Sequence, residues 1–161
     1  MFHNILIIGC GLIGKGLAKQ LRQKGHHIIG TTTRTTRVPE LEAICDRVEV
    51  LLGADREKVH RIAKGCDAVI VCAGPSAQKA MTPEQRKETY HQILVETAKN
   101  VVSAPMSGPI IALSSLSVHG DAANHLQEID ETSPLTDDED ASPACFQAAE
   151  RIYTQEAMDR A

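Results

Sequence analysis

The chain has 161 residues, which suffices for one hydrophobic core, so we expect residues 1–161 to form a single domain. A net charge of −4 and an aromatic content of 2% argue against nucleic acid as a partner, because a nucleic-acid surface needs a basic face and stacking rings. No apolar run reaches the roughly 18 residues of a membrane span, and the first apolar segment starts so early that we expect neither a membrane helix nor a signal peptide.

The first apolar segment, residues 5–8, leads directly into a run with three glycines, residues 9–14. Four consecutive apolar residues predict a strand that is buried on both faces. Apolar Ile13, Leu17 and Leu21 then recur every four residues, which predicts the inward stripe of an amphipathic helix.

Glycines at this spacing permit a tight turn, close approach of the backbone to a diphosphate, and close packing of a helix on a strand. The N–H groups at the start of the following helix would face the phosphates. A motif of this kind between a strand and a helix favours a dinucleotide site, and the alternative is a glycine turn in a domain that binds no nucleotide. The residues expected to bind the cofactor here are Gly9, Gly11, Leu12, Ile13 and Gly14.

The second strand is predicted at residues 26–30, with Gly25 closing the preceding helix. NAD-binding sites usually carry an acidic residue about 20 positions past the glycines, but this chain has no carboxylate between the glycine loop and Glu40. It has Thr33, Arg34 and Arg37 instead, and a guanidinium suits a 2′-phosphate. We therefore expect NADP(H) rather than NAD(H), bound by Thr33 and Arg34. The alternative is that both arginines are solvated loop residues.

The rest of the chain alternates strands with helices. Further strands are predicted at residues 48–52, 66–72 and 110–113, and helices at 56–64 and after a capping box at Thr82 to Gln85. This alternation predicts right-handed crossovers and a parallel sheet, that is, a doubly wound α/β fold with three α/β/α layers. Ligands of such sheets bind beyond the carboxyl ends of the strands, so we add to the cofactor site the residues Cys72, Ala73, Gly74 and Ser114.

These loops carry a family resemblance. The segments that carry it are residues 7–14, 65–70, 113–121 and 130–135, and together they span about residues 4 to 135. The chain resembles the short-chain dehydrogenase/reductase superfamily, and more closely its extended and atypical branch, which includes NAD-dependent epimerase/dehydratases of nucleotide sugars. The resemblance implies a Rossmann fold for NAD(P) and an activity on a hydroxyl or carbonyl group of a small-molecule substrate.

The resemblance also implies a catalytic serine at the end of the fifth strand, which matches Ser115, with Ser114 beside it. The family's Tyr-x-x-x-Lys pair is absent from the sequence. Depending on the alignment, its two positions fall on Phe146 and Glu150 or on Ser142 and Phe146, and neither pair can perform the usual proton transfer. Tyr153 is a possible substitute donor, although without a neighbouring cation it keeps an ordinary phenol pKa.

Extended family members continue beyond this helix with more strands and a substrate-binding region, so we expect either a truncated form or a minimal cofactor-binding unit. An uncovered sheet edge would favour a homodimer. The functional alternatives are therefore an NAD(P)-dependent oxidoreductase or epimerase, a non-catalytic NADP(H)-binding module or redox sensor, and an inactive truncated family member.

Other groupings of polar residues give weaker indications of function. The histidines and aspartate at His119, Asp121 and His125 are more typical of a loop than of a metal site, so no metal is expected. The acidic run at residues 137–140 is typical of a solvated loop. The five cysteines are odd in number and form no C-x-x-C pair, which favours reduced thiols and a cytoplasmic location.

Overall fold

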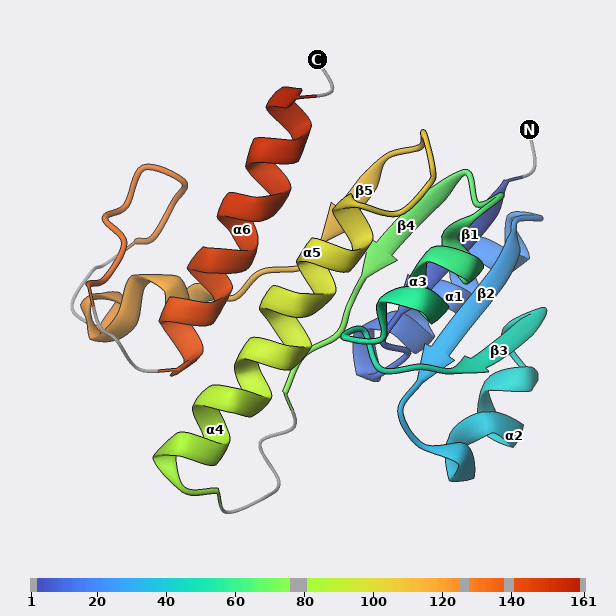
Figure 1. Ribbon diagram of the computed structural model, residues 1–161, viewed down its shortest axis with the longest axis horizontal. Coiled ribbons are helices and arrows are strands. Elements are labelled where there is room, and N and C mark those ends of the chain that lie inside the picture. Colours follow the sequence, from blue (N-terminus) through green and yellow to red (C-terminus); the bar gives the residue numbers. More distant parts are fainter. Residues whose placement is uncertain (1–2, 76–80, 125–127, 138–140, 160–161) are drawn as a thin grey trace.

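A computed structural model describes residues 3–75, 81–124, 128–137 and 141–159 of the protein. Within these residues, five parallel strands form one sheet in the order β3-β2-β1-β4-β5 (Figure 1). The strands are β1 (Asn4–Ile8), β2 (His27–Thr32), β3 (Arg47–Val50), β4 (Ala68–Val71) and β5 (Ile110–Ala112). Because β1 lies at the centre, Ile7 is paired with Gly30 of β2 on one side and with Ile70 of β4 on the other.

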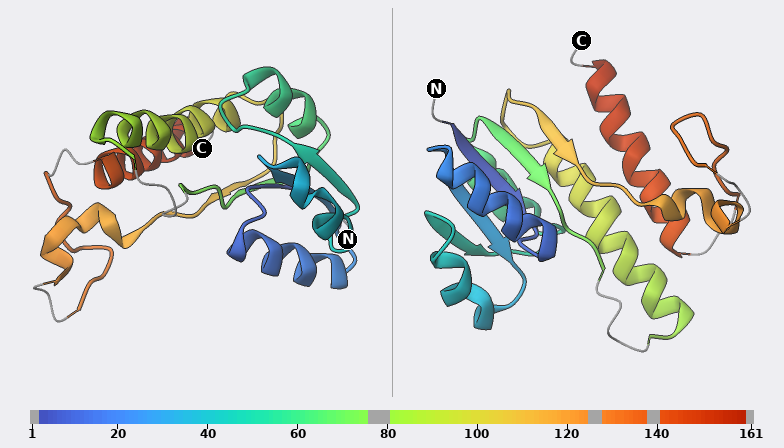
Figure 2. Two further views of the ribbon diagram at one scale, coloured as in Figure 1. Left: turned by 90° about the horizontal axis from the view of Figure 1, so that it is seen from below. Right: turned by 180° about the vertical axis from the view of Figure 1, so that it is seen from behind.

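Helices cover both faces of this sheet (Figure 2). One face carries α1 (Leu12–Gln23) and α2 (Val38–Glu42), which follows the 3-10 turn η1 (Thr35–Arg37). The other face carries α3 (Arg56–Ala63) and a long helix made of α4 (Pro83–Tyr90), the π-helical turn η2 (His91–Glu96) and α5 (Thr97–Val102). The last helix, α6 (Ala141–Asp159), packs beside this long helix and against the 3-10 segment η3 (Leu116–Asn124). The predicted three-layer, doubly wound fold is confirmed.

The alternation of side chains along β1 divides the core between the two faces. Leu6 and Ile8 pack with Val59 of α3 and its neighbours, whereas Ile5 and Ile7 pack with residues of α1 and α2. All four are buried, as the apolar run predicted for a central parallel strand. A third cluster joins η2 and α5 to α6 through Leu94, Ala98, Cys145 and Ala149.

Helix α1 corrects one prediction. Ile13 is 61% exposed and does not belong to the buried stripe. The helix instead approaches the sheet on Gly14 and Ala18, which are buried, while Leu17 and Leu21 pack at the margin. Small residues at the contact allow the helix to lie close to β1, and its first turn then extends past the ends of the strands, which leaves Ile13 in solvent.

The predicted helix ends agree well with the structure. Gly25 has φ +88°, and its N–H donates to the carbonyl of Arg22, which closes α1 as expected. Thr82 and Gln85 form the predicted capping box of α4. The structure also shows two elements that the sequence did not reveal to us, namely helix α2 and the π-helical turn η2.

Strand bounds differ from the predicted ones by a few residues. Strand β2 begins at His27 and continues to Thr32, so it is longer at its carboxyl end than predicted. Strand β3 ends at Val50, and β4 is limited to Ala68–Val71. The pairing of neighbouring strands, rather than apolar content, sets these limits.

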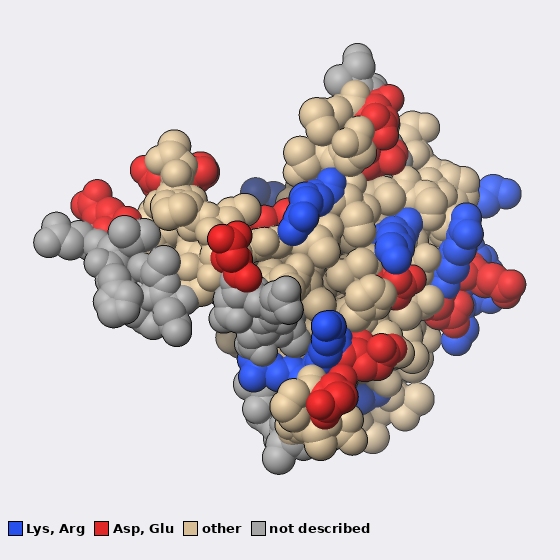
Figure 3. Space-filling view, turned by 60° about the vertical axis from the view of Figure 1, so that its left-hand side comes forward, with Lys and Arg blue, Asp and Glu red and all other residues tan. Residues whose placement is uncertain are grey.

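On the face drawn in Figure 3, basic and acidic side chains are interspersed rather than separated by sign, in keeping with a chain of 17 basic and 21 acidic residues. Among the described helices, none combines the length and the apolar character needed to cross a membrane.

Gly30 generates the first prediction. A Cβ at this position would lie 2.5 Å from Cys45 Sγ and 2.9 Å from Cys10 Sγ. We expect Gly30→Ala to lower the free energy of unfolding by about 1–3 kcal/mol, because a well-packed core must shift to admit the methyl group. Urea denaturation measures this change.

Gly16→Ala is the matched control, because Gly16 lies in α1 with open space around its Cβ position. There the substitution should be neutral or stabilise the protein by up to about 1 kcal/mol, since alanine favours helix over glycine. Equal stability of the Gly30→Ala variant and the wild type would contradict the expected clash.

Candidate functional site: a glycine loop and an adjoining pocket

The glycine loop is held tightly between the ends of β2 and β4. Gly9 has φ +91°, and a Cβ on it would lie 2.6 Å from both Cα and N of Ala73. Its N–H donates to Thr31 Oγ1 at 2.9 Å, and the N–H of Cys10 donates to the carbonyl of Thr31 at 2.8 Å. Only glycine permits both this backbone conformation and this close approach.

The start of α1 presents backbone N–H groups to an open space. A Cβ on Gly14 would lie 2.4 Å from the carbonyl oxygen of Gly9, so Gly14 sets the angle at which the helix leaves the loop. A Cβ on Gly11, the N-cap residue, would meet nothing within 4 Å. Among the described residues, no side chain caps this helix and no acidic residue lies in its first turn. Such an end is suited to an anion.

The apolar residues of this turn are open to solvent as well. Leu12 is 89% exposed, and its neighbour Ile13 is exposed too. Gly9, Gly11, Leu12, Ile13 and Gly14 thus lie together as the sequence predicted, although the contact of these residues with a cofactor stays a prediction.

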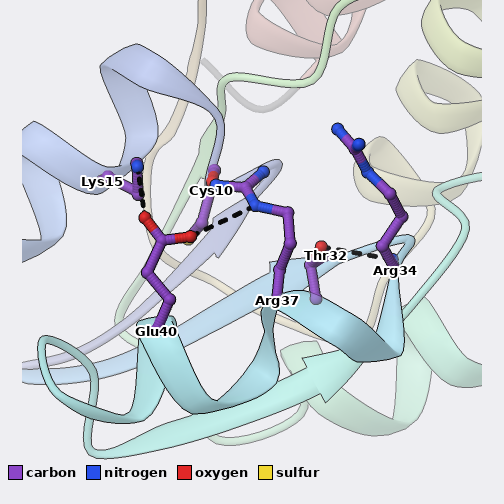
Figure 4. Close-up of polar contacts among 6 residues, drawn as sticks. All are labelled: Cys10, Lys15, Thr32, Arg34, Arg37 and Glu40. Carbon is purple, nitrogen blue, oxygen red and sulfur yellow. Dashed lines mark hydrogen bonds and ion pairs between the residues drawn. The ribbon is translucent and has the colours of Figure 1, made fainter.

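A charged cluster lies against the loop beyond the end of β2 (Figure 4). The guanidinium of Arg37 donates to the carbonyl oxygen of Cys10 at 3.0 Å and pairs with Glu40 at 3.5 Å. Glu40 also accepts a hydrogen bond from the ammonium of Lys15. The Lys15 ammonium, followed by the Arg37 guanidinium, holds the pKa of the Glu40 carboxyl below its ordinary value. Arg37 is therefore committed to the loop and to Glu40.

Arg34 extends separately from this cluster (Figure 4). Its backbone N–H donates to Thr32 Oγ1 at 3.2 Å, which turns the chain at the end of β2. Its guanidinium makes no hydrogen bond or ion pair with the residues that the structure describes, and both Arg34 and Thr33 are exposed.

The ion pair between Arg37 and Glu40 was not predicted from the sequence. The signal for it was their spacing, because residues three apart at the start of a helix lie side by side.

Two cysteine thiols meet behind the loop. Cys10 and Cys45 are both buried, and their thiols hydrogen-bond each other next to Gly30. The hydrogen bond with Cys45, followed by burial, raises the pKa of Cys10. The same bond lowers the pKa of Cys45, because the Cys10 S–H stabilises a thiolate there. All five cysteines of the chain are free thiols.

The residues after β4 connect the loop to a pocket. Cys72 and Ala73 are half-buried and Gly74 is exposed. The N–H of Cys72 donates to the carbonyl oxygen of Ile8, which extends the pairing of β1 and β4 by one residue. Burial raises the pKa of the Cys72 thiol. Ala73 contacts the glycine loop on one side and lines a pocket of about 350 Å³ on the other.

This pocket lies between the ends of β4 and β5, η2 and α6. Its polar lining comes from Ser114, Glu150, Tyr153 and Thr154, and Phe146 lies on the same wall. The expectation of an ordinary phenol pKa for Tyr153 is wrong, because burial raises the pKa of this side chain further above physiological pH, where it is neutral. The structure thus brings Ser114 together with Phe146 and Glu150, one of the two pairs that the alignments placed at the Tyr-x-x-x-Lys positions.

Ser115 has a local partner. Its Oγ accepts a hydrogen bond from the N–H of Ser117 at 3.2 Å, and its carbonyl accepts one from Val118. The hydroxyl of Ser142, from the other alignment, donates to Ser117 Oγ at 3.1 Å. The hydroxyls of residues 115, 117 and 142 thus lie near one another at the start of η3, and a catalytic role for Ser115 stays a prediction.

The histidines considered for a metal separate into different settings. His119 is buried, and its Nδ1 lies 2.9 Å from the carbonyl oxygen of Pro134. His125, and residues 138–140 of the acidic run, lie outside the described residues, as does the side chain of Asp121. Among the described residues, no group of three or more candidate ligands is placed to hold a metal.

Comparison with known proteins agrees with this geometry. The model of the NAD dependent epimerase/dehydratase family matches residues 5–154, and the chain belongs to that family. No curated protein sequence matched the chain.

Solved structures share the fold at low sequence identity. The Bordetella bronchiseptica enzyme WbmH, in complex with NAD⁺, is 18% identical, with a TM-score of 0.77 over 97% of this chain and 53% of the other. UDP-glucose-4-epimerase from Stenotrophomonas maltophila, with bound NAD and formylated UDP-arabinopyranose, is 16% identical, with a TM-score of 0.75 over 98% and 49%. A short-chain dehydrogenase/reductase superfamily protein from Agrobacterium tumefaciens, with bound NAD, is 19% identical, with a TM-score of 0.72 over 93% and 44%. The chain therefore spans about half the length of these structures.

The hydrogen bond from Gly9 to Thr31 generates the second prediction. Thr31→Val keeps the side-chain shape but leaves the Gly9 N–H without its acceptor, so we expect the free energy of unfolding to fall by about 1–3 kcal/mol. Thr33→Val, at an exposed position two residues further on, should change the stability little. Denaturant unfolding of the two variants distinguishes them, and an equal effect would contradict a special role for Thr31.

Proposed function

We propose that this chain binds a nicotinamide dinucleotide and forms the cofactor-binding part of an NAD(P)-dependent oxidoreductase or of a nucleotide-sugar epimerase/dehydratase-like enzyme. The observation that carries the proposal is the uncapped start of α1, which opens on a loop where Gly9 and Gly14 exclude any side chain. The bound cofactor would supply hydride transfer to and from a hydroxyl or carbonyl carbon of the substrate.

The residues of this chain fit the two halves of such a cofactor. The N–H groups at Leu12 and Ile13 would hold the diphosphate at the positive end of α1. Thr33 and Arg34 would contact the adenosine ribose. The small residues after β4 would let the cofactor extend from the diphosphate site toward Ser114; they are Cys72, Ala73 and Gly74. This role of Ala73 is supported by its position between the loop and the pocket.

We further propose NADP(H) as the preferred cofactor. The similar solved structures contain NAD, and this identifies the cofactor of those proteins rather than of this chain. Here the nearest carboxylate after the loop, Glu40, is already engaged by Lys15 and Arg37, so it is not available to a ribose hydroxyl. Arg34 is exposed and uncommitted among the described residues, and a 2′-phosphate would supply its partner.

For the reaction itself, we propose that Ser115 orients the reacting oxygen by donating a hydrogen bond, after its Oγ–H turns toward the substrate. The neutral phenol of Tyr153 can also donate a hydrogen bond into the pocket. The substrate would be a small molecule with a hydroxyl or carbonyl group, handled in the cytoplasm. We also propose that the chain forms a homodimer. Ile111 of the edge strand β5 is 53% exposed and Leu113, just after it, is 43% exposed, and exposed apolar residues at a sheet edge favour pairing with a second copy.

A second candidate function is a non-catalytic NADP(H)-binding module or redox sensor, or an inactive family member. The specific observation in its favour is that Phe146 and Glu150 occupy the wall of the pocket, since neither can donate a proton to a substrate as a tyrosine with a neighbouring lysine does. Hydride exchange between the cofactor and a carbonyl or hydroxyl substrate separates the two functions.

Calorimetric titration of the protein with NADPH and with NADH tests the proposed function. We expect saturable binding of NADPH at one site, and loss of that binding in Gly14→Ala, whose Cβ would press on Gly9. Gly16→Ala, on the same helix with open space at its Cβ, should bind as the wild type does. A wild-type protein that binds neither nucleotide would refute the proposal.

Arg34 generates the third prediction. Arg34→Ala should weaken NADPH binding about tenfold and leave NADH binding within about twofold, because only NADPH carries the phosphate that the guanidinium would pair with. The same titration measures both. If Arg37→Ala instead removes the preference for NADPH while Arg34→Ala has no effect, the phosphate lies at the Arg37–Glu40–Lys15 cluster and the assignment to Arg34 is wrong.

A further inference from the structure

The pocket beside Ala73 would lie next to an anionic nucleotide, yet the charged side chain in its described lining is a carboxylate. Ser114, Tyr153 and Thr154 contribute neutral groups, and Glu150 contributes a carboxylate. Among the described residues, no lysine or arginine lines the pocket. The apolar part of the lining includes Ile93 and Leu94.

The π-helical turn supports a binding role for this pocket. Ile93 and Leu94 both belong to η2, where the regular helix is interrupted between α4 and α5. Such turns are rare inside helices and are frequent at functional sites.

The carboxylate of Glu150 has no cationic partner within the part of the chain that the structure describes. It is half-buried, and it makes no ion pair with any residue that the structure describes. Its neighbour Arg151 is exposed and donates to the carbonyl oxygen of Gln147 on its own helix. A charge in a partly apolar pocket is unfavourable without a partner, so a cationic group in the ligand would be stabilised here.

Phe146 favours a cation for a second reason. It lies one helical turn before Glu150 and lines the same pocket. The face of an aromatic ring attracts a cation, and this attraction adds to that of the carboxylate. Both side chains at the positions of the missing Tyr–Lys pair, in one of the two alignments, therefore act in the same direction.

The position of the pocket identifies the cationic group. Ala73 lines it and also contacts Gly9, so the pocket adjoins the cradle for the diphosphate. The half of the cofactor that extends past Ala73 would carry the nicotinamide, whose ring is a cation when oxidised and neutral when reduced. We propose that Glu150, with Phe146, makes this pocket bind the oxidised nicotinamide in preference to the reduced one, an inference that rests on the proposed function.

Preferential binding also shifts the redox equilibrium of the bound cofactor. Stabilising the oxidised ring relative to the reduced one lowers the reduction potential of the bound couple, so NADP⁺ is retained and bound NADPH becomes the better hydride donor. Glu150 thereby influences the redox equilibrium of the bound cofactor.

The fourth prediction tests this proposal through binding alone. Calorimetry with NADP⁺ and NADPH gives the ratio of their dissociation constants, which should favour NADP⁺ in the wild type. In Glu150→Gln this preference should fall about tenfold, through weaker NADP⁺ binding, while NADPH binding stays within about twofold. Asp159→Asn removes a carboxylate from the exposed end of the same helix, outside the pocket, and should leave the ratio unchanged.

A fragment of the cofactor separates the possible failures. The probe 2′,5′-ADP carries only the adenosine half, so it should bind the wild type and Glu150→Gln equally. If 2′,5′-ADP binds both proteins but the NADP⁺ to NADPH ratio is the same in both, the inference is wrong and the proposed function stands. If Glu150→Gln weakens 2′,5′-ADP and both nucleotides alike, Glu150 has only a structural role and the inference is equally wrong. If the wild type binds none of the three ligands, the proposed function fails as well.

Discussion

The close packing of the glycine loop against two neighbouring backbones is the constraint on which the rest of this structure depends. Gly9 lies so near Ala73 that a single methyl group would overlap the backbone that follows β4, and a methyl group on Gly14 would overlap the carbonyl of Gly9. These two contacts bring β1, β4 and α1 to one point. They leave the first N–H groups of α1 facing open space, and they place Ala73 where it can contribute to both the cradle and the pocket.

Buried polar groups then hold this arrangement in place. Thr31 satisfies the N–H groups of Gly9 and Cys10 from the end of β2, and Arg37 satisfies the carbonyl of Cys10 from the start of α2. Because Glu40 pairs with both Arg37 and Lys15, it ties α2 to α1 across the loop. Family membership places this chain among dinucleotide-binding proteins, and its polar contacts explain how a loop with so little side-chain mass keeps one conformation.

The residues that line the pocket depart from the family pattern, and each of these departures favours a positively charged ligand. In the alignment that places the family's Tyr–Lys pair at Phe146 and Glu150, an aromatic ring and a carboxylate stand in the pocket where the family has a proton donor and a cation. Tyr153 lies one turn beyond Glu150 and two turns beyond Phe146, and burial raises the pKa of its phenol. Fold analogy alone would assign the family's mechanism to this chain, whereas these residues point toward a site that favours positive charge.

Local patterns in the sequence determined the order of the five strands and, apart from α2 and η2, of the helices between them. They also determined the capping box at Thr82, the turn at Gly25 and the composition of the glycine loop. Each depends on neighbouring residues or on a short periodicity, so no tertiary information was required. Only the tertiary structure decided that Ile13 faces solvent, that Arg37 rather than Arg34 grips the loop, and that Cys10 meets Cys45 beside Gly30. The pocket that joins Ala73 to Glu150 belongs to the same group. These features arise where segments far apart in the chain cross, and strand register and helix approach set their geometry, which no single segment encodes.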